Sequence, residues 1–143
     1  MFPWICLTCF DRAQGAAQCL EDAVVLSQLL SRVTHREQIP DVTSIYESMR
    51  KPRALKLKHR SEEMRDIYCV QNGPKQEERD RQLRDLEPYP GYVIPWLDPE
   101  FQRWMYTYDA SAEAGAAWKT YQEGKWPGTR GLWKLSKVEY TAW

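Results

Sequence analysis

Hydrophobic residues recur at helical spacing over two long stretches of the chain, and these stretches predict its two main helices. The first, over residues 15–32, is apolar around most of its circumference and has only a narrow polar stripe. The second, over residues 42–70, carries a narrower apolar stripe and contains Pro52, which predicts a kink. A helix as apolar as the first needs cover on most of its sides, so we expect it to pack against the second.

Shorter elements are predicted further along the chain. Acidic and basic residues alternate densely over residues 75–86, which favours a short exposed helix, and the three prolines and one glycine of residues 87–96 predict an extended surface loop. Asp98 followed by Pro99 is typical of a helix start. Asp109 or Ser111 then caps a last helix rich in small residues.

These elements predict a mostly α fold. We expect a helical fragment with two long helices, shorter helices, irregular aromatic-rich loops and no Rossmann sheet, with a short strand or two near Val93-Ile94 or in the tail. The predicted organisation is an apolar N-terminal segment over residues 1–10, a helical region over 11–123 and a tail of unknown role over 124–143. The 143 residues suffice for one domain with a core.

Charge and hydropathy narrow the possible partners. Lysine plus arginine and aspartate plus glutamate balance at 20 each, so no net field favours nucleic acid or an anionic membrane. The apolar run at the N-terminus is too short to span a bilayer and lacks the features of a signal peptide. We therefore predict a soluble, cytoplasmic protein with neither a nucleic-acid nor a membrane partner.

The four cysteines do not form a recognisable metal site. Cys6 and Cys9 have the two-residue gap of a zinc knuckle, but no second pair follows, and the two histidines are not spaced as ligands. We expect no metal, and buried or idle thiols in a reducing compartment.

Two other groups of polar residues could suggest chemistry. Glu21 and Asp22 are neighbours, and on a helix their side chains diverge by about 100°, which opposes a shared-proton pair and favours pairing with an arginine. The basic residues around Pro52 are interspersed with acids, which favours a solvated, ion-paired helix face over a phosphate site. His35 and His59 are expected to be solvated surface residues.

A small-residue stretch opens the first helix. Gly15, Ala16 and Ala17 leave the first turn almost bare, and the free N–H groups of a helix start suit a phosphate, a carboxylate or a ring carbonyl. A tight turn packed against another element explains the same residues equally well. The stretch resembles flavin-dependent aromatic hydroxylases of the salicylate-hydroxylase type, through the run Ala13-Gln14-Gly15-Ala16-Ala17-Gln18 followed by Glu21-Asp22-Ala23 and Leu26.

The resemblance extends over roughly residues 12–120, since the segment around Pro52 and residues 98–110 are also similar to fungal members of this family. It implies that Gln14, Gly15, Ala16 and Ala17 face the pyrimidine edge of FAD. It further implies an NAD(P)H- and O₂-dependent monooxygenase that hydroxylates an aromatic or polyketide-like substrate, with fungal secondary metabolism as the expected setting.

The chain departs from the family in two places. It contains no Gly-x-Gly-x-x-Gly, which would cradle the cofactor pyrophosphate, and residues 1–10 offer no Gly-Asp pair to hold the ribityl chain. We therefore expect the C-terminal portion of such an enzyme, from a truncated gene or with a new N-terminus, and weak or absent FAD binding by this chain alone. Catalytic residues and present activity stay open.

The alternative is a non-catalytic or repurposed helical module. Removal of a parent sheet would leave apolar helix faces uncovered, and such faces usually mark interfaces. On this hypothesis the chain binds a hydrophobic ligand, a protein partner or a second copy of itself.

Overall fold

The computed structural model describes residues 14–84, 87–92 and 94–126, and over this part of the chain the protein is helical and contains no strand. The mostly α prediction is therefore confirmed. In chain order the elements are α1 (Gln14–Leu30), the 3₁₀ helix η2 (Arg36–Gln38), α2 (Ile39–Tyr68), α3 (Pro74–Arg84), the 3₁₀ helix η3 (Pro95–Leu97), α4 (Pro99–Tyr106) and α5 (Ala110–Gln122).

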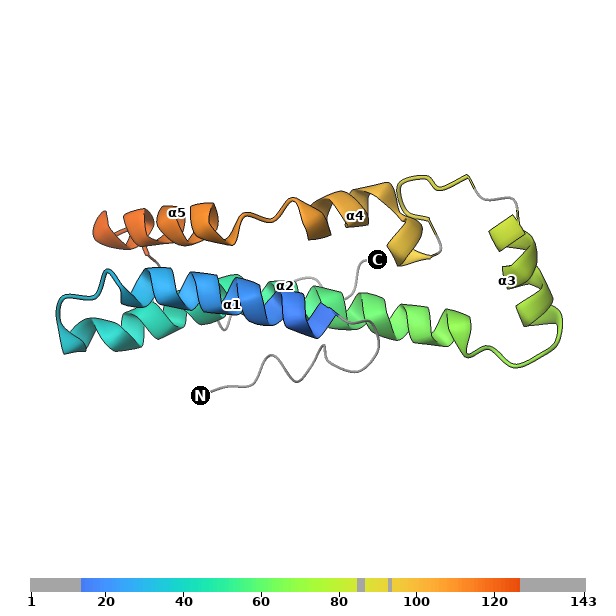
Figure 1. The fold of residues 1–143 in the computed structure, drawn as a ribbon, viewed down its shortest axis with the longest axis horizontal. Coiled ribbons are helices and arrows are strands. Elements are labelled where there is room, and N and C mark those ends of the chain that lie inside the picture. Colours follow the sequence, from blue (N-terminus) through green and yellow to red (C-terminus); the bar gives the residue numbers. More distant parts are fainter. Residues whose placement is uncertain (1–13, 85–86, 93, 127–143) are drawn as a thin grey trace.

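Helix α2 is the spine of an elongated molecule (Figure 1). Helix α1 runs antiparallel beside its first half, and α5 and α4 lie end to end along one side of this pair. Helix α3 lies at the far end of α2, where its Leu83 packs against buried residues and its Arg79 donates to the backbone carbonyl of Ile67. The predicted packing of the first helix on the second is confirmed, but α1 also packs extensively on α5, which the sequence analysis did not predict.

Three apolar clusters follow one another along α2. The largest joins α1, α2 and α5, and it contains Val25, Leu29, Val42, Ile45, Ala114 and Trp118. The second joins α2 to α4 through Leu57, Phe101 and Met105. The third, at the far end, holds Met64, Tyr92 and Ile94. The core is therefore a series of contacts along one long helix rather than a single central cluster.

Side-chain caps fix where the two last helices begin. The carboxylate of Asp98 accepts hydrogen bonds from the backbone N–H groups of Glu100 and Phe101, with Pro99 in the first position of α4. Asp109 caps α5 in the same way, so of the two predicted alternatives Asp109 is correct. The first cap fixes where the chain enters α4, and the second fixes where the short α4–α5 connection passes into α5.

The segment before α4 differs from its prediction. It is not wholly a surface loop, because Tyr92 and Ile94 are buried against Met64 and the backbone turns into η3. The short strand expected at Val93-Ile94 is not formed at Ile94, while Val93 and the tail lie outside the described residues. Burial of the two apolar side chains is the physical reason, since they complete the third cluster against the end of α2.

Candidate functional site

The four predicted site residues form the first turn of α1. Gln14 opens the helix and is half-buried, Gly15 is buried, and Ala16 and Ala17 are exposed. The exposed alanines carry only a methyl group, so a flat ligand can approach the backbone of this turn closely. The structure thus brings the four residues together on one helix end, with Gly15 turned toward the protein and the two alanines turned outward.

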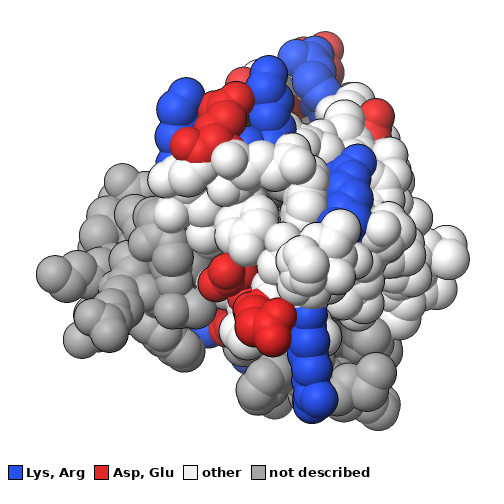
Figure 2. Space-filling view, turned by 90° about the vertical axis from the view of Figure 1, so that its left-hand side faces the viewer, with Lys and Arg blue, Asp and Glu red and all other residues white. Residues whose placement is uncertain are grey.

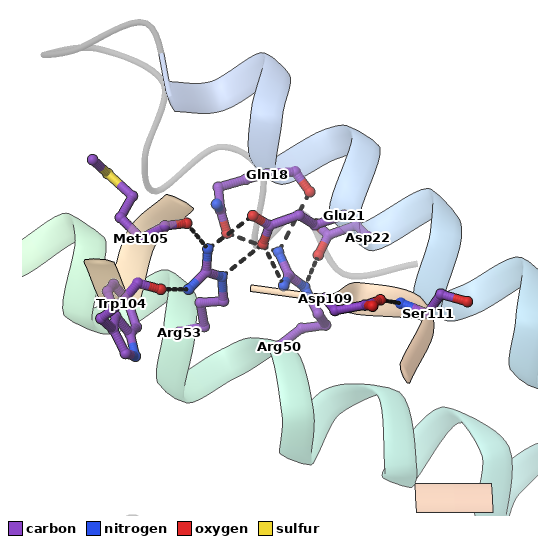
Figure 3. A network of polar contacts seen from close by, with 9 residues as sticks. All are labelled: Gln18, Glu21, Asp22, Arg50, Arg53, Trp104, Met105, Asp109 and Ser111. Atoms are coloured by element: carbon purple, nitrogen blue, oxygen red, sulfur yellow. Dashed lines mark hydrogen bonds and ion pairs between the residues drawn. The ribbon is translucent and has the colours of Figure 1, made fainter. Parts of the chain in front are cut away.

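One turn further on, α1 presents polar side chains to the protein interior. Gln18, Glu21 and Asp22 point from α1 toward Arg50 and Arg53 on α2 (Figure 3). Gln18 is 2% exposed and Asp22 8% exposed, so this side of the helix is shielded from water. The polar stripe of the first helix is therefore its inward side at this end of the molecule.

Arg50 lies at the centre of this network and is itself 1% exposed. Its Nε donates to Asp22 Oδ1 at 2.5 Å, its Nη1 to Glu21 Oε2 at 2.7 Å and its Nη2 to Gln18 Oε1 at 2.7 Å. A buried guanidinium needs partners for all of its donors, and the planar fork suits several acceptors at fixed angles. Three successive polar residues of α1 supply those acceptors.

Arg53 extends the network from α1 to α4. Its Nε and Nη2 donate to the two carboxylate oxygens of Glu21 at 2.7 and 2.8 Å, a bidentate pair. The same guanidinium donates to the backbone carbonyls of Trp104 at 3.3 Å and Met105 at 2.9 Å. These carbonyls belong to the last turn of α4, where carbonyls lack helical partners and the helix dipole is negative. Arg53 therefore fastens three helices at one point.

Aromatic rings cover the two guanidinium groups. The centre of the Arg53 guanidinium lies 4.1 Å from the Tyr108 ring centroid and 4.6 Å from that of Trp104. The Arg50 guanidinium lies 5.4 Å from the Tyr108 ring centroid. Rings at this distance attract a cation and exclude water from it. The network is thus held between an acidic side, provided by α1, and an aromatic side, provided by α4 and the residues after it.

Burial and the arginines have opposite effects on the Glu21 carboxyl. Burial acts to raise its pKa, but hydrogen bonds from Arg53 and Arg50 outweigh burial and hold the pKa below the ordinary glutamate value. Burial raises the pKa of the neighbouring Tyr46, and the carboxylate of Asp22 raises it further. Glu21 is therefore an anion at neutral pH, and Tyr46 is a neutral phenol.

Part of this arrangement was predicted from the sequence. Pairing of Glu21 or Asp22 with an arginine is confirmed for both acids. The prediction of a solvated, ion-paired face around Pro52 holds for the exposed Lys58–Glu62 pair but is wrong for Arg50 and Arg53, which are buried against α1. The available signal was their three-residue spacing, which places both on one face of α2 opposite the acid pair.

One buried donor in the network is left over. Gln18 Nε2 is buried and has no hydrogen-bond partner in the described part of the chain, because Arg50 occupies only the amide oxygen. The first N–H groups of any helix are likewise free of helical partners. The backbone N–H donors at this end of α1 suit a ligand edge rich in acceptors, and the small, exposed Ala16 and Ala17 leave room for a ring. These residues fit the carbonyl- and nitrogen-bearing edge of an isoalloxazine.

Other kinds of site have less support. Within the described residues no group of three or more histidines, cysteines or acids could hold a metal ion, and Cys6 and Cys9 lie outside them. His35 and His59 are exposed, as predicted. Among the described helices, none is both long enough and apolar enough to cross a membrane.

Comparison with known proteins identifies relatives of part of the chain. No protein-family profile matches it. It is 37% identical over 110 residues to the FAD-dependent monooxygenase OpS4 of Beauveria bassiana, covering 73% of this chain and 25% of that protein. It is also 35% identical to the FAD-dependent monooxygenase atnJ of an Arthrinium species and 33% identical to ntnJ of a Nectria species, each over 71 residues, half of this chain and 17% of the relative.

These matches confirm the resemblance found in the sequence, and the chain is homologous to part of the fungal FAD-dependent monooxygenases. It spans a quarter of the length of the first of these relatives.

Proposed function

We propose that the chain is the C-terminal part of an FAD-dependent monooxygenase and presents the first turn of α1 to the pyrimidine edge of the flavin. In this role the backbone N–H groups around Gly15, Ala16 and Ala17, together with Gln14, bind the ring edge. Homology to three proteins named FAD-dependent monooxygenases carries the proposal. The short exposed side chains of this turn support it from the geometry.

The arginine network has a defined part in this proposal. A helix end can bind a ring edge only if the helix is held at a fixed position, and Arg50 and Arg53 fasten α1 one turn after the proposed site. The positive helix end favours electron density on the pyrimidine oxygen and nitrogen of the ring. In this proposal the residues of this chain orient the flavin ring and favour electron density on its pyrimidine edge.

The reaction proposed for a complete enzyme is hydroxylation of an aromatic or polyketide-like substrate, in fungal secondary metabolism. Bound FAD supplies the oxygen-activating chemistry, with NAD(P)H as reductant and O₂ as the source of the oxygen atom. The chain itself lacks a Gly-x-Gly-x-x-Gly motif, so its own contribution to flavin affinity is expected to be small.

Amide NMR of the ¹⁵N-labelled chain tests the proposed contact even at low affinity. Titration with FMN to several millimolar is expected to shift the amides of residues 14–17. The amides of Ser111 and Ala112, in the first turn of α5, are an internal control because Asp109 already binds them. Inorganic phosphate is the control ligand, since it has the charge but lacks the ring.

A matched pair of variants sharpens the test. Ala17→Glu places a long anionic side chain over the proposed site and is expected to abolish the shifts, whereas Ala112→Glu, in the first turn of α5, leaves them intact. Absence of shifts at residues 14–17, shifts centred elsewhere, or equal shifts with phosphate alone would contradict the proposal.

A second candidate function is a non-catalytic helical module that binds a protein or a hydrophobic ligand. One observation favours it: the outward side of α1 exposes large apolar residues, with Leu20 70% exposed and Leu30 42% exposed. Tight stoichiometric flavin binding, seen in the visible spectrum of the purified chain with added FAD, would contradict the non-catalytic function.

A further inference from the structure

The basic side chains of α2 lie beside acids, with one exception. Those within ion-pair distance of a carboxylate are Arg50, Lys51, Arg53, Lys58, His59, Arg60 and Arg65. Acids also lie next to lysines and arginines on the end of the molecule where α1 passes into α2 (Figure 2). The exception is Lys56, which is exposed and has no acid partner in the described part of the chain.

Lys56 lies between two arginines on one side of α2. Arg53 precedes it by three residues and Arg60 follows it by four, the spacing at which side chains on a helix are neighbours. Like charges at this spacing repel each other and destabilise the helix. The acid of Arg53 is Glu21, at 2.7 Å. That of Arg60 is Glu63, at 2.8 Å. One positive charge of this group, that of Lys56, is therefore not neutralised by any residue that the structure describes.

Two aromatic rings of α4 hold these cations in position. The Nζ atom of Lys56 lies 4.3 Å from the ring centroid of Trp104. The centre of the Arg60 guanidinium lies 5.5 Å from the ring centroid of Phe101, and the two rings stack on each other. Aromatic faces at such distances attract a cation and restrict where its side chain lies. The Lys56 and Arg60 charges are therefore placed close together, where α2 meets α4.

The Lys56 ammonium is affected by this crowding. Partial burial lowers its pKa, and the charges of Arg60 and then Arg53 lower it further. One acid acts in the opposite direction, Asp98, and its effect is the smallest. The carboxylate of Asp98 is 4% exposed and already accepts backbone N–H groups at 2.9 and 3.1 Å. It therefore does not serve as the partner of Lys56.

We propose that Lys56 and Arg60 form a binding site for the phosphate group of a small molecule. A bound oxyanion relieves the repulsion between the two cations. The Lys56 ammonium offers a point charge with three donors. Arg60 uses Nη1 for Glu63, and its Nε and Nη2 have no partner in the described part of the chain. A phosphate dianion accepts from both side chains at once and suits two adjacent cations better than a carboxylate does.

The expected affinity is low, because the site is partly open to solvent and salt screens its charges. A dissociation constant of about 1–10 mM is expected for inorganic phosphate. The site goes beyond the proposed flavin contact and is separate from it, since residues 14–17 lie at the start of α1. In the FMN titration, signals of residues 14–17 report the flavin contact and those of Lys56 report the phosphate group. Either proposal can therefore fail while the other stands.

Side-chain NMR of the ¹³C- and ¹⁵N-labelled full chain tests the proposal, with inorganic phosphate added at constant ionic strength. The Cε–Hε signal of Lys56 is expected to shift and saturate. The pKa of Lys56 is expected to rise on binding, because a bound anion favours the ammonium. Lys58 is the internal control, since it lies on the same helix and already has Glu62 at 3.7 Å. Its signal is expected to stay in place.

A matched pair of variants locates the site. Lys56→Gln is expected to weaken phosphate binding about tenfold, followed at the Arg60 Nε signal, because one of two charged contacts is lost. Lys58→Gln is expected to leave binding unchanged. Both substitutions replace side chains at the helix surface, and circular dichroism checks that the helical signal is unchanged.

Two further ligands distinguish the source of the phosphate. A larger Lys56 shift with NADPH than with NADH, which lacks the 2′-phosphate, supports the site and assigns the group to the reductant of the proposed function. Equal shifts with the two support a site for a free phosphate. The proposal would be overturned if Lys56 gave no saturable shift, if Lys58 shifted equally, if chloride or acetate acted as strongly as phosphate, or if Lys56→Gln left binding intact.

Discussion

The inward side of α1 carries Gln18, Glu21 and Asp22 in its first half, whereas the outward side exposes Leu20 and Val24. A surface helix ordinarily turns its apolar residues to the core and its polar residues to water. Over the first half of α1 this arrangement is reversed. Over the second half it is restored on the inward side, where Val25 and Leu29 are completely buried in the largest apolar cluster.

The difference between the two sides follows from two free-energy costs, that of leaving a leucine exposed and that of leaving a buried arginine unpaired. Leaving a leucine exposed forgoes about 1.5–3 kcal/mol of burial. Leaving a buried arginine without its acidic partner costs about 3–5 kcal/mol, and α2 buries two arginines here. The cost of unpaired Arg50 and Arg53 therefore exceeds the gain from covering Leu20. The arginines of α2 decide which side of α1 faces inward.

The largest expected effect is the loss of the central arginine. Arg50→Ala removes a 1% exposed guanidinium and leaves Asp22 without its cation, so we expect the free energy of unfolding to fall by about 3–5 kcal/mol. Urea denaturation measures the change. Arg65→Ala, which removes an exposed arginine further along α2, serves as the control and should change stability by no more than about 0.5 kcal/mol. Equal losses for the two variants would contradict the network.

The two sides of α1 should also differ in their response to the same apolar truncation. Leu29→Ala opens a cavity in the largest cluster and is expected to cost about 2–5 kcal/mol. Leu20→Ala shortens a side chain that is 70% exposed and should change stability by no more than about 0.5 kcal/mol. Thermal unfolding of both variants makes the comparison. A Leu20→Ala loss as large as that of Leu29→Ala would show that the outward side is covered in the folded monomer.

A smaller effect is expected from acid. Because the folded-state pKa of Glu21 lies below its unfolded value, its ion pairs contribute their full stability above the ordinary glutamate pKa of about 4.3. That contribution is lost as pH falls from there through the lowered pKa. Glu21→Gln should therefore flatten the decline of stability in this acidic range, as measured by urea denaturation at successive pH values.

The exposed Glu78 gives the control for the acid series. Hydrogen bonds from Arg81 and Gln82 lower the pKa of its carboxyl to about 2. Its side chain is nevertheless half exposed, so solvent screens the pair and Glu78→Gln should change the acid profile little. If Glu21→Gln and Glu78→Gln give the same profile, Glu21 does not contribute through the buried network.

Local signals in the sequence predicted most of the helices. The helical periodicity and the caps at Asp98 and Asp109 depend on residues within a few positions of one another, and the structure agrees with them. The pairing of the Glu21-Asp22 acids with arginine was also predicted, because neighbouring side chains on a helix diverge and therefore do not share a proton.

What the sequence could not predict depends on contacts between distant segments. The partners of Gln18 and Asp22 lie 32 and 28 residues further along the chain, so the inward orientation of the polar stripe is not visible within α1. The same holds for the packing of α5 on α1 and for the burial of Tyr92 and Ile94 in a segment with the composition of a surface loop. The candidate flavin contact itself stays a prediction.

The central claim is that Arg53, through Glu21 and the last carbonyls of α4, fixes the position of α1. A double-mutant cycle of Glu21→Ala and Arg53→Ala measures it most directly, with the exposed pair Lys58–Glu62 on α2 as the reference cycle. We predict a coupling energy of about 1–3 kcal/mol for the buried pair and about 0.3–0.5 kcal/mol for the exposed pair. A Glu21–Arg53 coupling no larger than that of the exposed pair would contradict the account.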